Sequence, residues 1–592
     1  MTERVRKKGY QRVTRASVAA CMATLALTTA CRPASNQSAQ MEAANGAEVP
    51  YFGVQVDQVG YVPEESKMAF VSEAAEKFTV KNGAGETVLE GCVGTPIYWA
   101  EAGDSIRLID FSSLKAEGEY SIEVDGRLKS APFCIKSAPY RETLRKVCRA
   151  FYYNRASMAI DEEHGGRWAR AAGHPDTKVK VHATAASASR PEGTELSMSG
   201  GWYDAGDYNK YIVNSSITVY TMLLASQMYG PMDLDLNIPD HREGVADLTT
   251  ETLYNLRWML TMQDPEDGGV YHKLTTLNFE GFIMPADCKG ERYVIQKSTG
   301  ATLDFAATMA AASRMLPNLM VDEGLKSLAD SCKEAAIKAY AWAVANPDKA
   351  FDHNPEGVTT GAYEDVDLDG EWFWASTEMA LSVDYERYRA EAAKYAGDYG
   401  VPEWGNTGTL AYMSMVEADM SVTMSNPADV LWRITDELMA MEAANPAAVS
   451  LKKYDWGSNS FVANGAMVKL MAIASERAMT ERAEKAMQSV RNDVHYLLGR
   501  NATGYCFVTG VGSKSPMHIH HRPSAADGIE EPVPGFLVGG PNLVQPTDCG
   551  GDGSERGIYP AKGYEDVECS YSTNEIAINW NAPMVFTLLG VK

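Results

Sequence analysis

The sequence predicts a small all-β sandwich followed by a large all-α domain. Short apolar segments separated by turn signals fill residues 51–137, whereas helical stretches recur through residues 138–592. The chain has 592 residues, of which 45% are hydrophobic, so it can bury at least two sizeable cores.

Residues 1–30 have the pattern of a secretory signal. An uncharged stretch, 16–30, follows several basic residues and is too short to span a bilayer comfortably. It ends at Cys31 in a sequence that resembles a bacterial lipoprotein processing site, so we expect Cys31 to carry lipid. The alternative is conventional cleavage, with an ordinary cysteine at this position. Residues 31–50 suit a flexible tether. We therefore expect an exported lipoprotein of the outer membrane, on either of its faces.

The β-sandwich prediction rests on apolar runs and on the turns between them. Asn82-Gly83, Glu117-Gly118 and Asp125-Gly126 have turn chemistry. The runs are 52–56, 68–71, 78–80, 106–111, 120–124 and 133–135. This pattern favours a small sandwich.

The helical prediction rests on apolar periodicity. Several stretches are amphipathic or apolar all round, as expected where one ring of helices is sheathed by another. The intervening loops are long and rich in glycine, aromatic residues and aspartate, so we expect them to carry function. The expected helices are 144–156, 217–228, 248–263, 302–315, 323–345, 372–381, 427–443, 459–474, 481–498 and 574–589.

The formal net charge of −24 argues against nucleic acid as a partner. A neutral glucan needs no electrostatic steering, although a solvated acidic surface explains the charge equally well. Besides Cys21 and Cys31 there are eight cysteines, and their spacing leaves the pairing open.

Two carboxylates, Asp204 and Asp207, lie among glycines and aromatic residues in the segment 200–211. Glycines let the backbone approach a ligand closely, and aromatic faces suit sugar rings. Neighbouring carboxylates can also divide roles, with one activating water and the other positioning it. A turn or a calcium ligand set is the alternative.

Glu575 is a second catalytic candidate, at the start of the helix expected over 574–589. Tyr571 and Trp580 could desolvate its carboxyl group and raise its pKa into the range of a general acid. Alternatively, a glutamate in a first helical turn simply complements the helix dipole.

Three histidines, His518, His520 and His521, precede Arg522. They suggest zinc, but neither a helical His-Glu-x-x-His pattern nor paired cysteines accompany them. Hydrogen bonding of imidazole and guanidinium groups to sugar hydroxyls is the preferred interpretation.

The segments 200–211, 505–524 and 566–582 together resemble glycoside hydrolase family 9, which contains many endoglucanases. Residues 56–61 and 133–135 look like the immunoglobulin-like module that precedes the catalytic domain in one branch of this family. The resemblance implies an immunoglobulin-like sandwich over 51–137 and an (α/α)6 barrel over 138–592. Further matching segments are 267–273, 301–307, 456–460 and 534–542.

The resemblance also implies catalytic roles. Asp207 corresponds to the base that activates water, Asp204 to its helper, and Glu575 to the acid that protonates the departing oxygen. His520 and Arg522 correspond to residues that contact the sugar and the carboxylates. Inversion follows if base and acid stand about 6.5–9.5 Å apart.

Asp566 corresponds to the second acidic residue of the carboxyl-terminal motif, which orients the site or transfers protons. Aromatic side chains near the motifs are candidates for stacking on sugar rings, although tryptophans at helical positions are as often core residues. The stacking candidates are Trp202, Tyr208, Trp374, Trp456 and Tyr571.

The expected chemistry requires no cofactor. Many relatives bind calcium near residues 365–374, but here Gly370 replaces a common aspartate, and the segment 404–406 lacks the aspartate that usually follows. Oxygen ligands remain at Asp365, Asp367, Asp369 and Glu371. Some relatives bind zinc through cysteine and histidine, and the corresponding segments 155–157 and 173–175 lack those cysteines. We expect no metal in the catalytic centre.

The sequence thus predicts an inverting endo-β-1,4-glucanase acting on cellulose-like, mixed-linkage or xyloglucan chains. An exo-acting enzyme on oligosaccharides is an alternative, because related chains can have blocked clefts, and loops such as 284–299 would decide this. A non-catalytic, glycan-binding surface lipoprotein is the alternative of another class.

Overall fold

The computed structural model describes residues 52–230, 234–319 and 323–591. The expected signal 1–30, the tether 31–50 and the lipid attachment residue Cys31 lie outside this part of the chain. Within the described residues, no helix combines the length and the apolarity that a membrane crossing needs.

The amino-terminal strands form two sheets. One has the order β1-β3-β7-β6; the other has the order β2-β10-β8-β4-β5, with β9 beside β8. Strands β2 and β10 pair in parallel, and the other neighbours pair antiparallel. The strands are β1 (Val54–Gln55), β2 (Gly60–Tyr61), β3 (Met68–Val71), β4 (Lys77–Asn82), β5 (Thr87–Cys92), β6 (Ile97–Trp99), β7 (Asp104–Asp110), β8 (Gly118–Val124), β9 (Leu128–Lys129) and β10 (Phe133–Ile135).

Alternation of side chains along these strands builds a separate core. In β8, Tyr120, Ile122 and Val124 are buried, and partly exposed residues alternate with them, as the period of two in a strand requires. Tyr61 packs edge-on against Phe111, with ring centroids 5.1 Å apart. The predicted β-sandwich is confirmed.

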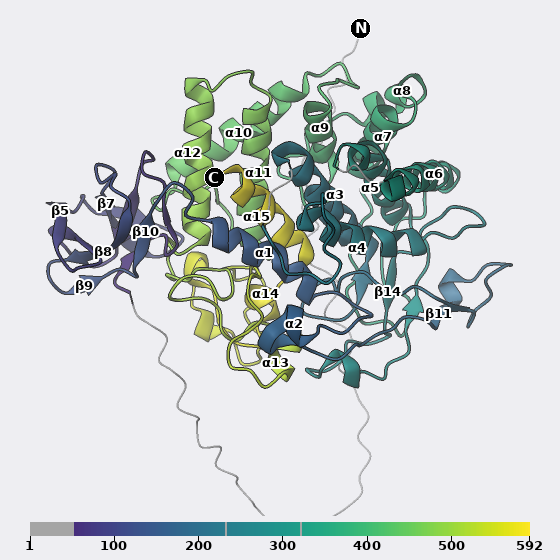
Figure 1. Cartoon of the computed structure of the whole chain (residues 1–592), viewed down its shortest axis with the longest axis horizontal. Helices are drawn as coiled ribbons and strands as arrows, with labels where there is room; N and C mark the ends of the chain where they lie inside the picture. Colours follow the sequence, from purple (N-terminus) through teal and green to yellow (C-terminus); the bar gives the residue numbers. More distant parts are fainter. Residues whose placement is uncertain (1–51, 231–233, 320–322, 592) are drawn as a thin grey trace, which may run out of the picture. The chain divides into compact units, whose positions relative to one another are not determined.

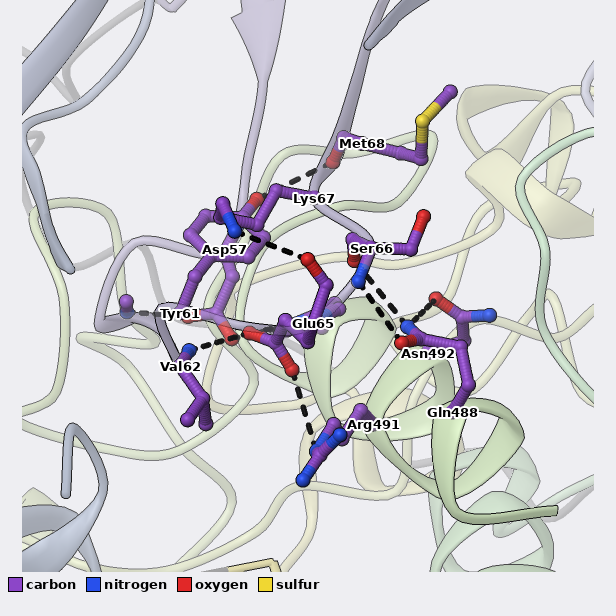
Figure 2. A network of polar contacts seen from close by, with 12 residues as sticks. Asp57, Tyr61, Val62, Glu65, Ser66, Lys67, Met68, Gln488, Arg491 and Asn492 are labelled. Atoms are coloured by element: carbon purple, nitrogen blue, oxygen red, sulfur yellow. Dashed lines mark hydrogen bonds and ion pairs between the residues drawn. The ribbon is translucent and has the colours of Figure 1, made fainter. Parts of the chain in front are cut away.

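Buried polar contacts join the sandwich to helix α12 (Glu481–Leu497). The Glu65 carboxylate lies 3.4 Å from Nε of Arg491 (Figure 2). The fully buried carboxylate of Asp57 lies 2.8 Å from Nδ1 of His495. Burial holds the pKa of His495 well below its usual value, so the ring is neutral, and burial also raises the pKa of Asp57.

Twelve helices of ten or more residues follow in the described part of the chain, arranged as two rings. In the inner ring α3, α5, α7, α9, α11 and α15 pack in succession, and α15 closes the ring against α3. Each outer helix packs on an inner one, and Figure 1 shows α15 between α1 and α11. The bounds are α1 (Arg141–Tyr153), α3 (Ile212–Tyr229), α4 (Asp247–Thr261), α5 (Thr299–Leu319), α6 (Glu323–Ala345), α7 (Asp369–Ser382), α8 (Tyr385–Tyr395), α9 (Gly408–Glu417), α10 (Pro427–Ala444), α11 (Ser458–Ala474), α12 and α15 (Ile578–Gly590).

The two rings explain the two kinds of helix in the sequence. Inner helix α3 is buried continuously from Ile212 to Ser226, whereas outer helix α1 buries Leu144, Val147 and Phe151 on one face. The (α/α)6 barrel is confirmed. Helices α8 and α9 are not among the predicted stretches; α8 buries only Tyr388 and Ala392 fully, so its apolar periodicity is weak.

The barrel domain also contains a small sheet that the sequence analysis does not predict. Its order is β12-β11-β15-β14-β13, and β13 directly follows the loop with Asp204 and Asp207. The strands have only two or three residues, too few for a recognisable period. They are β11 (Val179–Val181), β12 (Glu195–Leu196), β13 (Lys210–Tyr211), β14 (Lys273–Thr275) and β15 (Tyr293–Val294).

The helix expected over 574–589 is interrupted, which corrects the placement of Glu575. Helix α14 (Tyr571–Asn574) ends before Glu575, whose backbone is extended at φ −73° and ψ 156°, and α15 begins only at Ile578. Glu575 therefore lies in no helical turn, and the helix-dipole interpretation does not apply. Two other short helices are α2 (Glu162–Gly165) and α13 (Arg522–Ala526).

Candidate active site

The loop with Asp204 and Asp207 lies against the segment with Glu575. The Gly206 N–H donates to Oε1 of Glu575 over 3.2 Å, across 369 positions of sequence. A Cβ on Gly206 would lie 2.0 Å from the His520 carbonyl oxygen, so only glycine allows this approach. Three distant segments thus meet at one place.

Asp207 is buried and keeps one carboxylate oxygen free. Its Oδ2 accepts hydrogen bonds from Asn209 Nδ2 at 2.6 Å and from the Tyr211 hydroxyl at 3.3 Å. Its Oδ1 has no hydrogen-bond partner among the described residues. Burial raises the pKa of Asp207, and the positive charge of Arg522 opposes that rise. The free oxygen is suited to accept a proton from water.

Asp204 is fully engaged by neutral donors. Asn214 Nδ2 lies 2.9 and 3.0 Å from its two oxygens, and the Tyr363 hydroxyl donates to Oδ2 over 2.6 Å. Burial and the negative charge of Asp207 raise the pKa of Asp204 to about 8. At neutral pH this carboxyl therefore tends to hold a proton, which favours ionisation of its neighbour.

Glu575 lies in an environment that favours the protonated acid. Burial, then the charge of Asp207, raises its pKa to about 8, while Arg522 opposes the shift. Its backbone is held on both sides, by a bridge to His520 and by the Gly539 N–H, which donates to its carbonyl over 2.9 Å. A fixed carboxyl group that keeps its proton at neutral pH can serve as a general acid.

His520 and Arg522 lie in the same site. Nδ1 of His520 lies 2.7 Å from the Glu568 carbonyl and donates to it, so Nε2 carries the lone pair. Burial lowers the pKa of His520 to about 4, and the ring is neutral at pH 7. Arg522 donates to the carbonyls of Gly206 and Glu280, each over 2.8 Å, and these bonds fix its guanidinium group.

Asp566 restrains the histidine segment. Its carboxylate accepts the backbone N–H of Met517 at 2.8 Å and of His518 at 2.9 Å. Asn574, next to Glu575, also donates to it, over 3.2 Å. With these three donors, the Asp566 carboxylate ties the segment before His520 to the residue before Glu575, as a positioning group would.

A profile of glycosyl hydrolase family 9 matches residues 140–588. The chain belongs to glycosyl hydrolase family 9. A second profile, of the cellulase N-terminal ig-like domain, matches residues 52–129. The family 9 site described above thus lies in the barrel, behind an immunoglobulin-like domain, and the chain is a glycoside hydrolase.

Similar family 9 proteins cover most of this chain. A xyloglucan-specific endo-beta-1,4-glucanase of Bacteroides ovatus is 40% identical over 91% of this chain and 93% of that protein. Endoglucanase D of Acetivibrio thermocellus is 30% identical over 91% and 83%. Among solved structures, a family 9 protein of Bacteroides ovatus has a TM-score of 0.83 at 38% identity, covering 91% of this chain and 98% of the other.

Three of the five expected stacking residues are not available to a sugar. Trp202 and Trp374 are 0% exposed and Tyr208 is 2% exposed, so their stacking role was wrong. Trp202 donates to Glu251 and belongs to the core between helices, where an aromatic ring contributes by burial. Trp456, in contrast, is 39% exposed.

The open aromatic surface of this family 9 site comes partly from residues that the sequence analysis missed. Trp456 lies 5.5 Å from Tyr571, whose ring is 5.9 Å from that of His520. Phe279 and Phe282 are 46% and 38% exposed, and the Arg522 guanidinium lies 5.5 Å from each ring. Their clustering beside Arg522 arises only from folding, because their loop has no motif.

A disulfide and a buried arginine fasten the segment that leads to Glu575. Cys549 and Cys569 are bonded to each other, which resolves one pairing that the sequence left open. Arg556 is 4% exposed; it bonds to Asp548 and donates to the Ser570 hydroxyl over 2.6 Å. Glu568, whose carbonyl accepts the hydrogen bond from His520, directly precedes Cys569. The disulfide and the Arg556 contacts, here called the clamp, therefore support the catalytic centre.

The calcium ligands suggested by sequence gather only in part. Asp365 and Glu371 influence each other's pKa, whereas Asp367 and Asp369 are exposed. Asp304, which the sequence analysis missed, joins the first two; neither of its buried oxygens has a hydrogen-bond partner among the described residues, and burial raises its pKa. Asp304 and Glu371 thus have buried carboxylate oxygens without partners among the described residues, and oxygen donors are what Ca²⁺ prefers.

The three neighbouring histidines do not converge on one point. His521 contacts Ser524 through Nδ1 and Asn154 through Nε2, and His518 is exposed. His520 faces the Glu568 carbonyl, as described above. This arrangement favours the hydrogen-bonding interpretation over a zinc centre within this trio.

Proposed function

We propose that this family 9 enzyme cleaves internal β-1,4 links of xyloglucan-type chains with inversion of the anomeric centre. The observation that carries the proposal is the pairing of Asp207, with a free carboxylate oxygen, and Glu575, with a pKa raised to about 8. One group is thus poised to accept a proton and the other to give one, as hydrolysis of a glycosidic bond requires.

In the proposed reaction Glu575 protonates the glycosidic oxygen as the bond to the anomeric carbon breaks. Asp207 removes a proton from a water molecule that attacks this carbon from the opposite face. Asp204, which hydrogen-bonds Tyr363 and Asn214, keeps a proton and leaves the negative charge on Asp207. At the end of the turnover Glu575 is ionised and Asp207 protonated, so both protons must exchange with solvent.

The remaining residues of the site bind and position. Nε2 of neutral His520 can accept a hydrogen bond from a sugar hydroxyl, and Arg522 offers its remaining N–H groups to sugar oxygens. Asp566 acts indirectly by holding the segment of His520. Trp456 and Tyr571 offer stacking faces for the sugar rings.

The xyloglucan preference rests on the Bacteroides ovatus relative, which is named as xyloglucan-specific. A cellodextrinase of Butyrivibrio fibrisolvens is 29% identical over 91% of this chain, so exo-action on short chains is the second candidate. Hydrolysis of tamarind xyloglucan, barley β-glucan and cello-oligosaccharides, followed by viscosity, product length and product anomer, separates the two. A rapid fall in viscosity with α-configured products supports endo-action with inversion. Slow release of short sugars without a fall in viscosity contradicts it, and binding without cleavage points to the non-catalytic alternative.

We also propose that the mature chain is exported and lipid-anchored through Cys31. The signal-like pattern of residues 1–30 supports this, together with a disulfide that requires an oxidising compartment. The test is partition between detergent and aqueous phases after expression with the full leader. The chain with its native Cys31 is expected in the detergent phase, and the Cys31→Ala variant in the aqueous phase. Identical partition of the two would contradict lipidation.

A structural calcium ion at Asp304, Asp365 and Glu371 is a further proposal. The cation would neutralise three partly buried or buried carboxylates and so stabilise the barrel between α5 and α7. Chelation is expected to lower the melting temperature, and added Ca²⁺ to restore it. An Asp304→Asn variant that still responds fully to chelation would contradict this location.

A further inference from the structure

Three potential metal ligands meet where the two ends of the loop 280–288, which carries Phe282, lie close to His174. One ring nitrogen of His174, one carboxylate oxygen of Glu280 and Sγ of Cys288 all lie within 4.8 Å of one another. Nitrogen, oxygen and thiolate sulfur together suit Zn²⁺, whereas Ca²⁺ and Mg²⁺ prefer oxygen alone.

His174 has one ring nitrogen available for a metal. Nδ1 lies 2.9 Å from the Tyr203 hydroxyl, while Nε2 is buried and has no hydrogen-bond partner among the described residues. The residue is only 7% exposed, so water does not readily reach this nitrogen. The Tyr203 hydroxyl can accept Nδ1–H and thereby place the lone pair on Nε2, as outer partners of zinc-binding histidines do.

Cys288 and Glu280 supply the two acidic donors. Cys288 forms no disulfide, and its Sγ contacts the Met284 carbonyl only weakly, at 3.7 Å. Oε1 of Glu280 accepts the Gly290 N–H over 3.2 Å and has a second lone pair; Oε2 is the other available donor. A thiolate and a carboxylate would balance the two charges of Zn²⁺.

The positive side chains nearby are held by other contacts. The Asp176 carboxylate lies 2.7 Å from Lys210 Nζ and 3.1 Å from Arg292 Nε. Arg522 is bonded to two backbone carbonyls. These contacts hold the cationic groups in fixed positions and partly offset their repulsion of a metal ion.

The segments that the three ligands come from are packed closely. A Cβ on Gly173 would lie 2.4 Å from atoms of Pro285, and the Tyr208 hydroxyl donates to the Ile283 carbonyl over 2.6 Å. Between Glu280 and Cys288 the loop carries Phe282, whose ring centroid is 5.2 Å from that of His520. A cross-link at this point would therefore fix an aromatic wall of the candidate active site.

We propose that His174, Glu280 and Cys288 bind one Zn²⁺ that anchors the loop 280–288. Glu280 and Cys288 lie outside the segments through which some relatives bind zinc. In the segment 155–157, where zinc-binding relatives have a cysteine, this chain has Arg155, which is buried in an ion pair with Glu251. The role is structural: the metal holds the loop and takes no part in proton transfer.

Metal binding is tested on the purified full chain after chelation and dialysis. We expect calorimetric titration with ZnCl₂ to give one bound ion, and CoCl₂ to produce a thiolate-to-metal charge-transfer band. Cys288→Ser should abolish the band and lower zinc affinity more than about 100-fold, and Tyr203→Phe should lower affinity about 10-fold, as loss of an outer partner does. Cys92→Ser removes an exposed free thiol elsewhere and is the matched control.

A second measurement avoids variants that could fail to fold. Alkylation of the unmodified protein, read by peptide mass spectrometry, should slow at Cys288 when ZnCl₂ is present and stay unchanged at Cys92. The proposal is overturned if no stoichiometric zinc binds, if the band persists in Cys288→Ser, or if zinc protects neither thiol. Zinc binding is read without substrate, so its result is independent of the glucanase proposal.

Discussion

Replacement of Glu575 by glutamine is the sharpest test of the proposed acid. The amide side chain of Glu575→Gln would keep the shape of the native carboxyl group and could still accept the Gly206 N–H, which lies 3.2 Å from Oε1 in the native site. The amide has no acidic proton to give. The variant therefore removes one function and leaves the geometry of the loop nearly unchanged.

The expected loss follows from what general acid catalysis contributes. Turnover of xyloglucan should fall about 10²–10⁴-fold, because the departing sugar hydroxyl is a poor leaving group. With a dinitrophenyl cello-oligoside the dinitrophenolate group leaves without protonation. Turnover of this substrate by the variant should therefore fall far less. KM should change little, because proton donation by Glu575 acts only in the transition state and the amide keeps the contact with the Gly206 N–H.

The pH profile gives an independent measure. The pKa of Glu575 is raised to about 8, so the acid is protonated below this pH and only about one-tenth protonated at pH 9. Native activity on xyloglucan should therefore fall as pH rises through about 8. Glu575→Gln should lose this alkaline limb on the activated substrate.

Two controls separate the acid from the base and from general damage. Asp207→Asn should lose activity on both substrates alike, because water activation is needed whatever the leaving group. Glu484→Gln, on the exposed face of α12, should behave like the native chain. Equal losses of Glu575→Gln on both substrates, or an unchanged alkaline limb, would refute the assignment.

Three further predictions concern rings, the clamp and the domain contact. Trp456→Ala should raise KM for xyloglucan about 10-fold through loss of aromatic stacking and leave the melting temperature unchanged. Trp374→Ala should destabilise the buried core by about 3–5 kcal/mol in denaturant titrations. The reverse pattern would contradict the placement of the two tryptophans. Replacing Cys549 and Cys569 together by serine should lower stability by about 2–4 kcal/mol and reduce kcat, measured with and without reductant on the native chain as control. Asp57→Ala leaves several buried neutral donors unpaired and should cost about 1–3 kcal/mol for each of them in urea unfolding, without a change in KM if the contact only joins the domains.

Local pattern was enough to predict much of the architecture. The apolar run 120–124 and the turn at Asp125-Gly126 predicted strands, and both lie in the sandwich. The all-round apolar character of α3 predicted an inner ring. The strands of the small sheet escaped prediction, because two or three residues give no period and their pairing partners are distant in sequence.

The site was predictable where residues of a motif are neighbours in sequence. Asp204, Asp207 and the segment of His520 could be singled out because glycines, aromatic rings and ionisable groups are concentrated there. Phe279 and Phe282 could not, since no local pattern distinguishes a buried from an open phenylalanine. Trp374 shows the opposite error: its position in a motif suggested stacking, but the inner ring buries it.

The sequence by itself determined the order of domains, the family and the carboxylates that the site contains. Only the tertiary structure decided that Glu575 lies in an extended break, that Gly206 touches it, and that burial with Asp207 raises its pKa to about 8. The physical reason is the distance along the sequence over which each effect acts. Periodicity and turn chemistry act over a few residues, whereas desolvation and charge interaction depend on which distant segments the fold brings together.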